Sequence, residues 1–97
     1  MKAKIVNFDG EHSPAITFIR TQVFVKEQGI DSAIDFDGLD KGATHTLVNY
    51  QDISIGTGRI LDDGHIGRIA VLKECRSRGV GALILKTIIG EAKIRGV

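Results

Sequence analysis

Several residue types that could fix a structure by themselves are scarce in this chain. The only cysteine, Cys75, excludes an internal disulfide framework and a zinc site made of several cysteines. The only proline is Pro14, and the sequence contains no linker, internal repeat or low-complexity tract. No apolar run approaches the roughly 20 residues of a transmembrane helix, and the first residues do not resemble a signal peptide. We therefore expect a soluble cytoplasmic protein with no membrane partner.

An excess of charge of either sign is also missing. The chain has 13 lysines and arginines and 12 aspartates and glutamates, so its formal net charge is +1. No strong overall field would attract a nucleic acid, and we expect no nucleic-acid partner. The composition, 42% hydrophobic and 26% charged, is typical of folded proteins. At 97 residues, the chain is expected to form a single domain over residues 1–97 with a thin core.

The first third of the chain predicts one strand and one long helix. Residues 4–8 read as a short strand. Ser13 is a suitable N-cap before Pro14, and apolar residues at helical spacing predict a helix over residues 14–28 that Gly29 ends. Residues 31–41 read as a loop with about one helical turn. Its four acids are either solvated turn residues or a sign of a weak preference for a cationic substrate. They are Asp31, Asp35, Asp37 and Asp40.

The rest of the chain predicts three antiparallel strands and a second helix. The alternating segments are residues 43–50, 53–61 and 65–72. Asp63-Gly64 between the last two indicates a hairpin with a type I′ turn. Residues 80–95 follow the helical period, with an apolar face broad enough to pack on a sheet. The expected fold class is α+β, with the order β-α-β-β-β-α and a mainly antiparallel sheet.

The segment between the last predicted strand and the last predicted helix has the pattern of an anion site. Amides at a helix N-terminus point outward and the helix dipole adds positive potential, while glycines let phosphate oxygens approach the backbone. A P-loop and a dinucleotide-binding fingerprint both require residues that are absent here. A solvated surface turn remains the alternative. The candidate binding residues are Ile69, Ala70, Val71, Arg76, Ser77, Arg78, Gly79, Val80 and Gly81.

This segment also carries a family resemblance. Arg76-x-x-Gly79-x-Gly81, placed between an apolar strand and a helix, resembles the acetyl-CoA pyrophosphate loop of the GNAT superfamily of N-acetyltransferases. Residues 19–28 (IRTQVFVKEQ), together with Asp35-Phe36-Asp37, Asp40 and His45, resemble its small ElaA-like subgroup. Residues 57–59 and 66–71 fit the paired central strands of that subgroup. The resemblance covers nearly the whole chain, and the combination in this order is more specific than the loop alone.

The resemblance implies direct transfer of an acetyl group from acetyl-CoA to a small amine, without a metal. Main-chain groups of residues 69–71 would bind the pantetheine arm, and residues 76–81 would bind the pyrophosphate. Deprotonation of the amine needs a general base, for which Glu27 and His45 are candidates. Both have simpler interpretations: Glu27 as a surface charge at a helix end, and His45 as a hydrogen-bonded structural histidine. Arg20 is expected to pair with Asp37 or Asp40 in a structural role.

The resemblance also implies a partial fold. GNAT domains continue with a strand, a helix and two more strands, whereas this chain ends at Val97. The region after the last helix often supplies the tyrosine that protonates the CoA thiolate, and Tyr50 does not match it. We therefore expect a truncated GNAT domain of weak or absent activity. The alternative is a non-catalytic CoA- or phosphate-binding protein or a structural homodimer. A homodimer is expected in either case, through the edge at Val71 or the surface of Leu85, Ile89 and Ala92.

Overall fold

The structure, a computed structural model, describes residues 1–96. Four strands form one antiparallel sheet in the order β1-β2-β3-β4. The predicted α+β class and the β-α-β-β-β-α order are confirmed, with short helical segments added. The elements are β1 (Lys2–Asn7), α1 (Ser13–Arg20), the π-helix η1 (Thr21–Glu27), α2 (Ser32–Asp35), β2 (Thr44–Tyr50), β3 (Ile53–Ile60), β4 (Ile66–Val71), the 3-10 helix η2 (Lys73–Cys75) and α3 (Val80–Arg95).

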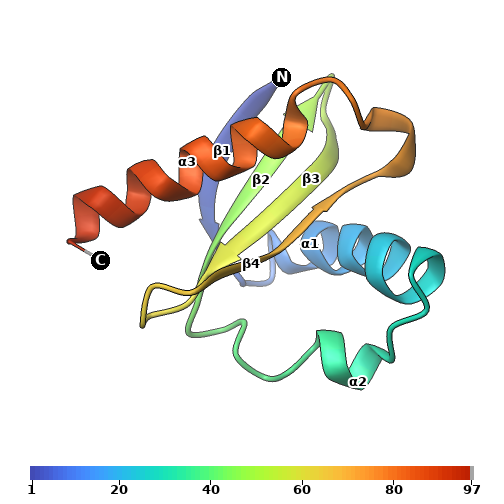
Figure 1. Cartoon of the computed structure of the whole chain (residues 1–97), viewed down its shortest axis with the longest axis horizontal. Helices are drawn as coiled ribbons and strands as arrows, with labels where there is room; N and C mark the ends of the chain where they lie inside the picture. The colour runs from blue at the N-terminus through green and yellow to red at the C-terminus, as the bar shows by residue number, and fades with distance from the viewer. Residues whose placement is uncertain (97) are drawn as a thin grey trace.

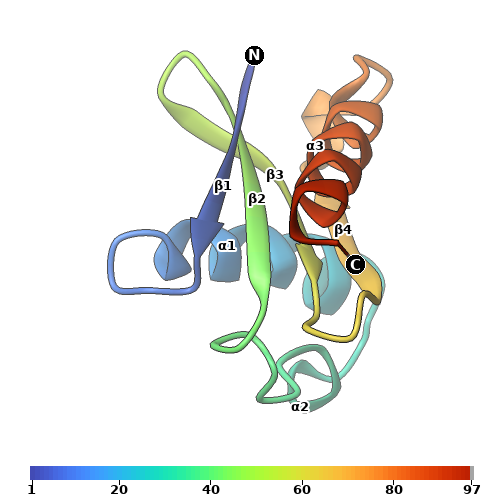
Figure 2. The ribbon, with the colours of Figure 1, turned by 90° about the vertical axis from the view of Figure 1, so that its left-hand side faces the viewer.

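Helices cover both faces of the sheet (Figures 1 and 2). On one face, Ile16 and Ile19 of α1 pack with Val6 and Leu47 of the sheet. On the other face, three apolar residues of α3 pack on β2 and β3; they are Val80, Ile84 and Ile88. Because both faces are covered, the central strand β3 is buried from Ile55 to its end. The result is two thin cores, one on each side of the sheet.

Two glycines of β3 allow α3 to pack close to the sheet. A Cβ atom at Gly56 would lie 2.8 Å from Cγ1 of Val80, and one at Gly58 would lie 2.6 Å from Cγ2 of Ile84. Both distances are shorter than the roughly 3.5–4.0 Å of normal contact between carbon atoms. The missing side chains therefore set the depth at which α3 lies, and with it the position of its N-terminus beside β4.

Two turn and helix predictions need correction. The type I′ turn is at Gln51-Asp52, where φ is +50° and +66°, and not at Asp63-Gly64, where only Gly64 has a positive φ. The connection at Asp63-Gly64 is a three-residue loop, as its backbone hydrogen bonds from Gly64 N to Leu61 O and from Leu61 N to His65 O indicate. The prediction of Ser13 as N-cap is also wrong, because His12 occupies that position.

The long helix predicted over residues 14–28 is present but changes type. It is α-helical to Arg20 and π-helical from Thr21 to Glu27, before Gly29 with φ +73°. A second irregularity is a bulge in β4, where the register against β3 shifts beside Gly58 and Arg68 has φ +50°. Among residues 1–96, no helix is long and apolar enough to cross a membrane.

Candidate functional site

A groove of about 350 Å³ lies between the end of β4 and the start of α3. It contains eight of the nine candidate binding residues: Ile69, Ala70, Val71, Arg76, Ser77, Gly79, Val80 and Gly81. The ninth, Arg78, is exposed on the same loop. Val23 and Gln28 complete the lining. Neither was among the candidate binding residues, although both lie in the stretch 19–28 that carries the family resemblance, because only the fold brings that helical segment here.

The backbone of the groove has the form expected of an anion site. Gly79, with φ +81°, directly precedes α3, and Ser77 also has a positive φ of +65°. Gly79 O accepts from Leu83 N, so the amides of residues 80–82, in the first turn, have no partner within the helix. These donors and the positive end of a 16-residue helix face the same region. The arrangement suits a diphosphate.

The two arginines of the loop have different surroundings. Arg76 donates from Nη1 and Nη2 to the two carboxylate oxygens of Glu27, at 2.6 and 2.5 Å, and from Nε to Val71 O at 3.0 Å. Within residues 1–96, Arg78 makes no side-chain hydrogen bond or ion pair. Of these two arginines, Arg78 is therefore the one available to a bound anion.

Glu27 is placed beside the groove, but its carboxylate is engaged. The Arg76 guanidinium holds the pKa of Glu27 below its usual value, since it donates two hydrogen bonds to the ionised form. A carboxylate in this state is a weak proton acceptor. The role of Glu27 as general base stays a prediction, and the geometry gives it a second candidate role in holding the loop.

His45 lies in the core of the protein and lines none of the hollows described. Its Nε2 donates to Asp40 O at 3.0 Å, its ring contacts Phe8, and its Nδ1 has no partner in the described residues. Burial lowers the pKa of His45, so the ring stays neutral. This placement matches the structural interpretation. Its role as general base stays a prediction.

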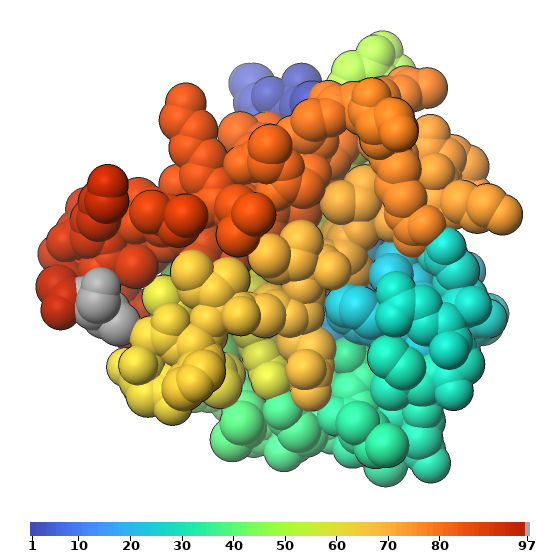
Figure 3. Space-filling model, in the orientation of Figure 1, coloured from blue at the N-terminus to red at the C-terminus, as the bar shows by residue number. Residues whose placement is uncertain are grey.

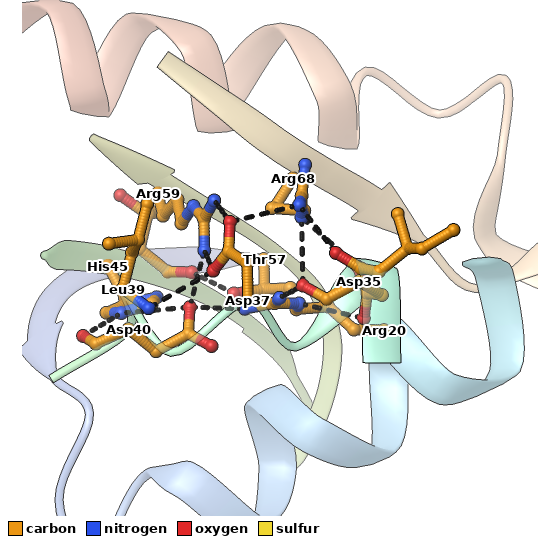
Figure 4. Close-up of polar contacts among 11 residues, drawn as sticks. Arg20, Asp35, Asp37, Leu39, Asp40, His45, Thr57, Arg59 and Arg68 are labelled. Atoms are coloured by element: carbon orange, nitrogen blue, oxygen red, sulfur yellow. Dashed lines mark hydrogen bonds and ion pairs between the residues drawn. The ribbon is translucent and has the colours of Figure 1, made fainter. Parts of the chain in front are cut away.

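A partly buried cluster of three arginines and three aspartates holds the 31–41 segment against the sheet (Figure 4). Arg20, at 0% exposure, reaches Asp40 (2.6 Å) and Asp35 (3.3 Å). This confirms Asp40 as a partner of Arg20, whereas Asp37 pairs with Arg59 and Arg68. Arg59 contacts Asp40 as well, and Arg68 contacts Asp35. Each aspartate thus meets two arginines.

The cluster corrects the interpretation of Asp35 and Asp40 as solvated turn residues, whereas Asp31 and Asp37 are exposed and accept from the amides of Ala33 and Leu39, as turn residues do. Asp35 and Asp40 are only 2% and 5% exposed, and the Arg59 guanidinium holds the pKa of Asp37 far below its usual value. The three positive and three negative charges of the cluster balance, while Asp31 lies outside it and is exposed. The suggested preference for a cationic substrate stays a prediction. Arg59 and Arg68 were missed from the sequence. The available signal was Arg59 itself, a charge in a strand of otherwise uncharged residues, which requires a partner when the strand is buried.

The sequence profile of the acetyltransferase (GNAT) domain family matches residues 14–97. This chain belongs to the GNAT family. The uncharacterized N-acetyltransferase YjcF of Bacillus subtilis is 36% identical to it over 91 residues, which cover 91% of this chain and 64% of YjcF. YyaT, an uncharacterized protein of the same organism, is 34% identical over 85 residues, covering 81% of this chain and 57% of YyaT. The chain thus spans less than two thirds of these curated relatives.

Solved GNAT structures have the same fold. Escherichia coli ElaA superposes with a TM-score of 0.82 at 24% identity, covering 95% of this chain and 69% of ElaA. An acyl-CoA N-acyltransferase of Pseudomonas aeruginosa gives 0.82 at 22% identity, covering 95% of this chain and 70% of its own. At these identities the likeness concerns the fold alone. The sequence-based expectation of a GNAT fold with ElaA-like features, over part of the usual length, is confirmed.

Proposed function

We propose that this chain binds acetyl-CoA in the groove beside β4 and serves the transfer of its acetyl group to a small amine. The observation that carries the proposal is the groove itself. Main-chain groups of residues 69–71 at the end of an edge strand lead into a loop with free amides at the start of α3. An extended arm and a diphosphate would each find their matching donors there.

We infer that turnover by the 97-residue chain is weak. Within residues 1–96, no histidine, tyrosine or cysteine lines the groove. The single tyrosine, Tyr50, borders a different hollow with Met1 and Asp52. A departing CoA thiolate therefore has no evident proton donor beside it. A protein that binds CoA without catalysis is the second candidate, and this lack of an acid favours it.

Binding is tested by thermal shift with CoA and acetyl-CoA. A ligand at 100 times its Kd stabilises the folded state by about 2.7 kcal/mol, so a clear rise in melting temperature is expected. Thiol release with a panel of amines then separates the two candidates. No stabilisation by either ligand would refute the proposal, and rapid amine-dependent thiol release would refute weak turnover.

Two glycines of α3 provide a matched pair of variants for the same assay. Gly81 lines the groove, Gly90 lies elsewhere on α3, and a Cβ atom at either one meets no atom within 4 Å. We expect Gly81→Val to reduce the CoA-induced shift, because the new side chain occupies space needed by phosphate oxygens, and Gly90→Val to leave it unchanged. Gly79 is less suitable, since its φ of +81° strains any other residue.

We also propose a homodimer. β4 is an edge strand with a free side within the described sheet, and Leu85 and Ile89 of α3 are 41% and 43% exposed. Pairing of two copies would cover the Val71 edge or this apolar surface, which Ala92 extends. Light scattering at micromolar concentration should give twice the monomer mass; a stable monomer would contradict the proposal.

A further inference from the structure

We propose that Glu27 and Arg76 form a clasp that holds the loop after β4 in its anion-binding shape, so that Arg76 anchors this loop and does not bind the diphosphate. The clasp deepens the function proposed above and depends on it. It assigns Glu27 a positioning role at the cofactor groove, and it leaves direct contact with the anion to Arg78 and the main-chain amides.

The contacts of Arg76 carry this assignment. Its guanidinium uses three donors on the protein: two on the Glu27 carboxylate, 49 residues away in the sequence, and one on Val71 O at the end of β4. A planar fork on a carboxylate is the geometry that arginine holds best. Turning the guanidinium toward a diphosphate would break all three bonds. The Glu27–Arg76 pair is also neutral as a unit, so it adds little positive field to the groove.

The loop needs such an anchor. Ser77 has φ +65°, a region that residues other than glycine rarely adopt, and Gly79 follows with φ +81°. Within the loop, few backbone bonds stabilise this path: Cys75 N to Leu72 O and Arg76 N to Lys73 O. In the sequence, Arg76 stands at the end of this hydrogen-bonded turn, directly before Ser77 and shortly before Gly79, the residues with positive φ. Fixing it on Glu27 and Val71 holds the amides that follow in position.

The clasp joins two parts of the fold that are distant in sequence. Arg76 lines the cofactor groove, whereas Glu27 lines a second hollow between η1 and the start of the loop, together with Lys26 and Lys73. Figure 3 shows the loop, in orange, close to the end of η1, in cyan to teal, at one side of the molecule. The ion pair therefore lies between the two hollows and connects the loop to η1.

The sign of one substitution separates the clasp from direct phosphate binding. Replacing Glu27 with glutamine removes a negative charge near the groove and frees Arg76. If Arg76 were a phosphate ligand, Glu27→Gln would bind CoA as tightly as wild type or more tightly. If Arg76 is an anchor, the variant loses the fork and binds CoA more weakly, by roughly fivefold, the upper end for an exposed ion pair. Isothermal titration of CoA measures this.

Glu74→Gln is the matched control. Glu74 acts on Arg76 through its charge alone and makes no side-chain hydrogen bond in the described residues. The same change of charge there should leave the Kd for CoA within about twofold of wild type. Equal weakening by Glu74→Gln and Glu27→Gln would overturn the clasp, because the effect would then be one of charge alone.

Two further variants test the coupling. Arg76→Gln should weaken CoA binding at least as much as Glu27→Gln, because it also removes the donor to Val71 O. The double variant should be no worse than Arg76→Gln alone, since the pair acts as a unit. A double variant that binds CoA much more weakly than Arg76→Gln would overturn the clasp, because the two residues would then act independently.

The melting temperatures of the ligand-free variants separate positioning from general stability. The clasp predicts that they stay near the wild-type value while the Kd for CoA rises. A loss of CoA affinity that only follows a loss of stability would overturn the positioning role. If the wild-type chain does not bind CoA, the proposed function fails and the clasp with it. Wild-type binding with an unaffected Glu27→Gln variant refutes the clasp alone.

Discussion

Replacing Gly58 with alanine places a methyl group where α3 already packs against β3. The new Cβ would lie 2.6 Å from Cγ2 of Ile84 and 2.9 Å from Cδ1 of Ile88. Cδ1 of Ile88 is the end of a flexible side chain and can turn away. Cγ2 of Ile84 is attached directly to Cβ of a fully buried residue, so relief requires a movement of the helix itself.

The size of the effect follows from this distance. Normal contact begins near 3.5 Å, so α3 must shift by roughly 0.9 Å or the site must stay compressed. Overpacking of this kind costs about 1–3 kcal/mol, which in a chain of this size lowers the melting temperature by roughly 5–20 °C. The shift also displaces the N-terminus of α3, so CoA binding should weaken.

The assay is urea unfolding followed by circular dichroism, with Gly90→Ala as control. Gly90 lies in α3 with open space around its Cβ position, and alanine there should stabilise the chain by about 0.4–1 kcal/mol. Combining Gly58→Ala with Ile84→Ala should cost less than the sum of the single changes, because the new methyl group fills part of the space that Ile84 leaves. A Gly58→Ala variant as stable as wild type would refute the packing argument.

Two further predictions concern the buried charges. Arg20→Met removes a fully buried guanidinium from Asp35 and Asp40. It should lower the free energy of unfolding, measured by the same urea assay, by about 3–5 kcal/mol. A loss below about 1 kcal/mol would contradict the stabilising role given to this cluster. Acidification should reduce stability in two stages. Burial keeps the pKa of His45 below 6.5, so below about pH 6.5 the unfolded chain takes up a proton that the folded chain does not. Arg59 keeps the pKa of Asp37 below 3.8, so the stability that the ionised Asp37 contributes is lost as the pH falls below about 4. Unfolding curves that are unchanged between about pH 7 and 4 would rule out the stage assigned to His45.

The features that were predictable from the sequence depend on neighbouring residues. The period of residues 80–95 predicted α3 with its observed bounds, because its apolar residues and its flanking glycines act within a few turns. The groove was predictable for the same reason, since a strand, a loop and a helix N-terminus follow one another in the chain. Eight of the nine predicted residues therefore line one hollow.

The features that were missed depend on contacts across the fold. Nothing near Arg59 in the sequence indicates that it meets Asp37, 22 residues earlier. The pairing of Glu27 with Arg76 likewise needs the fold to bring η1 to the loop. The type I′ turn was assigned to Asp63-Gly64 because glycine adopts a positive φ easily, whereas at Gln51-Asp52 the pairing of β2 and β3 imposes it.

Amide chemical shifts during a CoA titration show whether the proposed binding of acetyl-CoA takes place in the groove beside β4. In a chain labelled with nitrogen-15, we expect the largest shifts at the amides of residues 69–71 and 77–82. We expect the amides around Tyr50, which border a separate hollow, to stay unchanged. Shifts concentrated around Tyr50, or no shift at residues 77–82 with CoA in excess, would show that CoA does not bind in this groove.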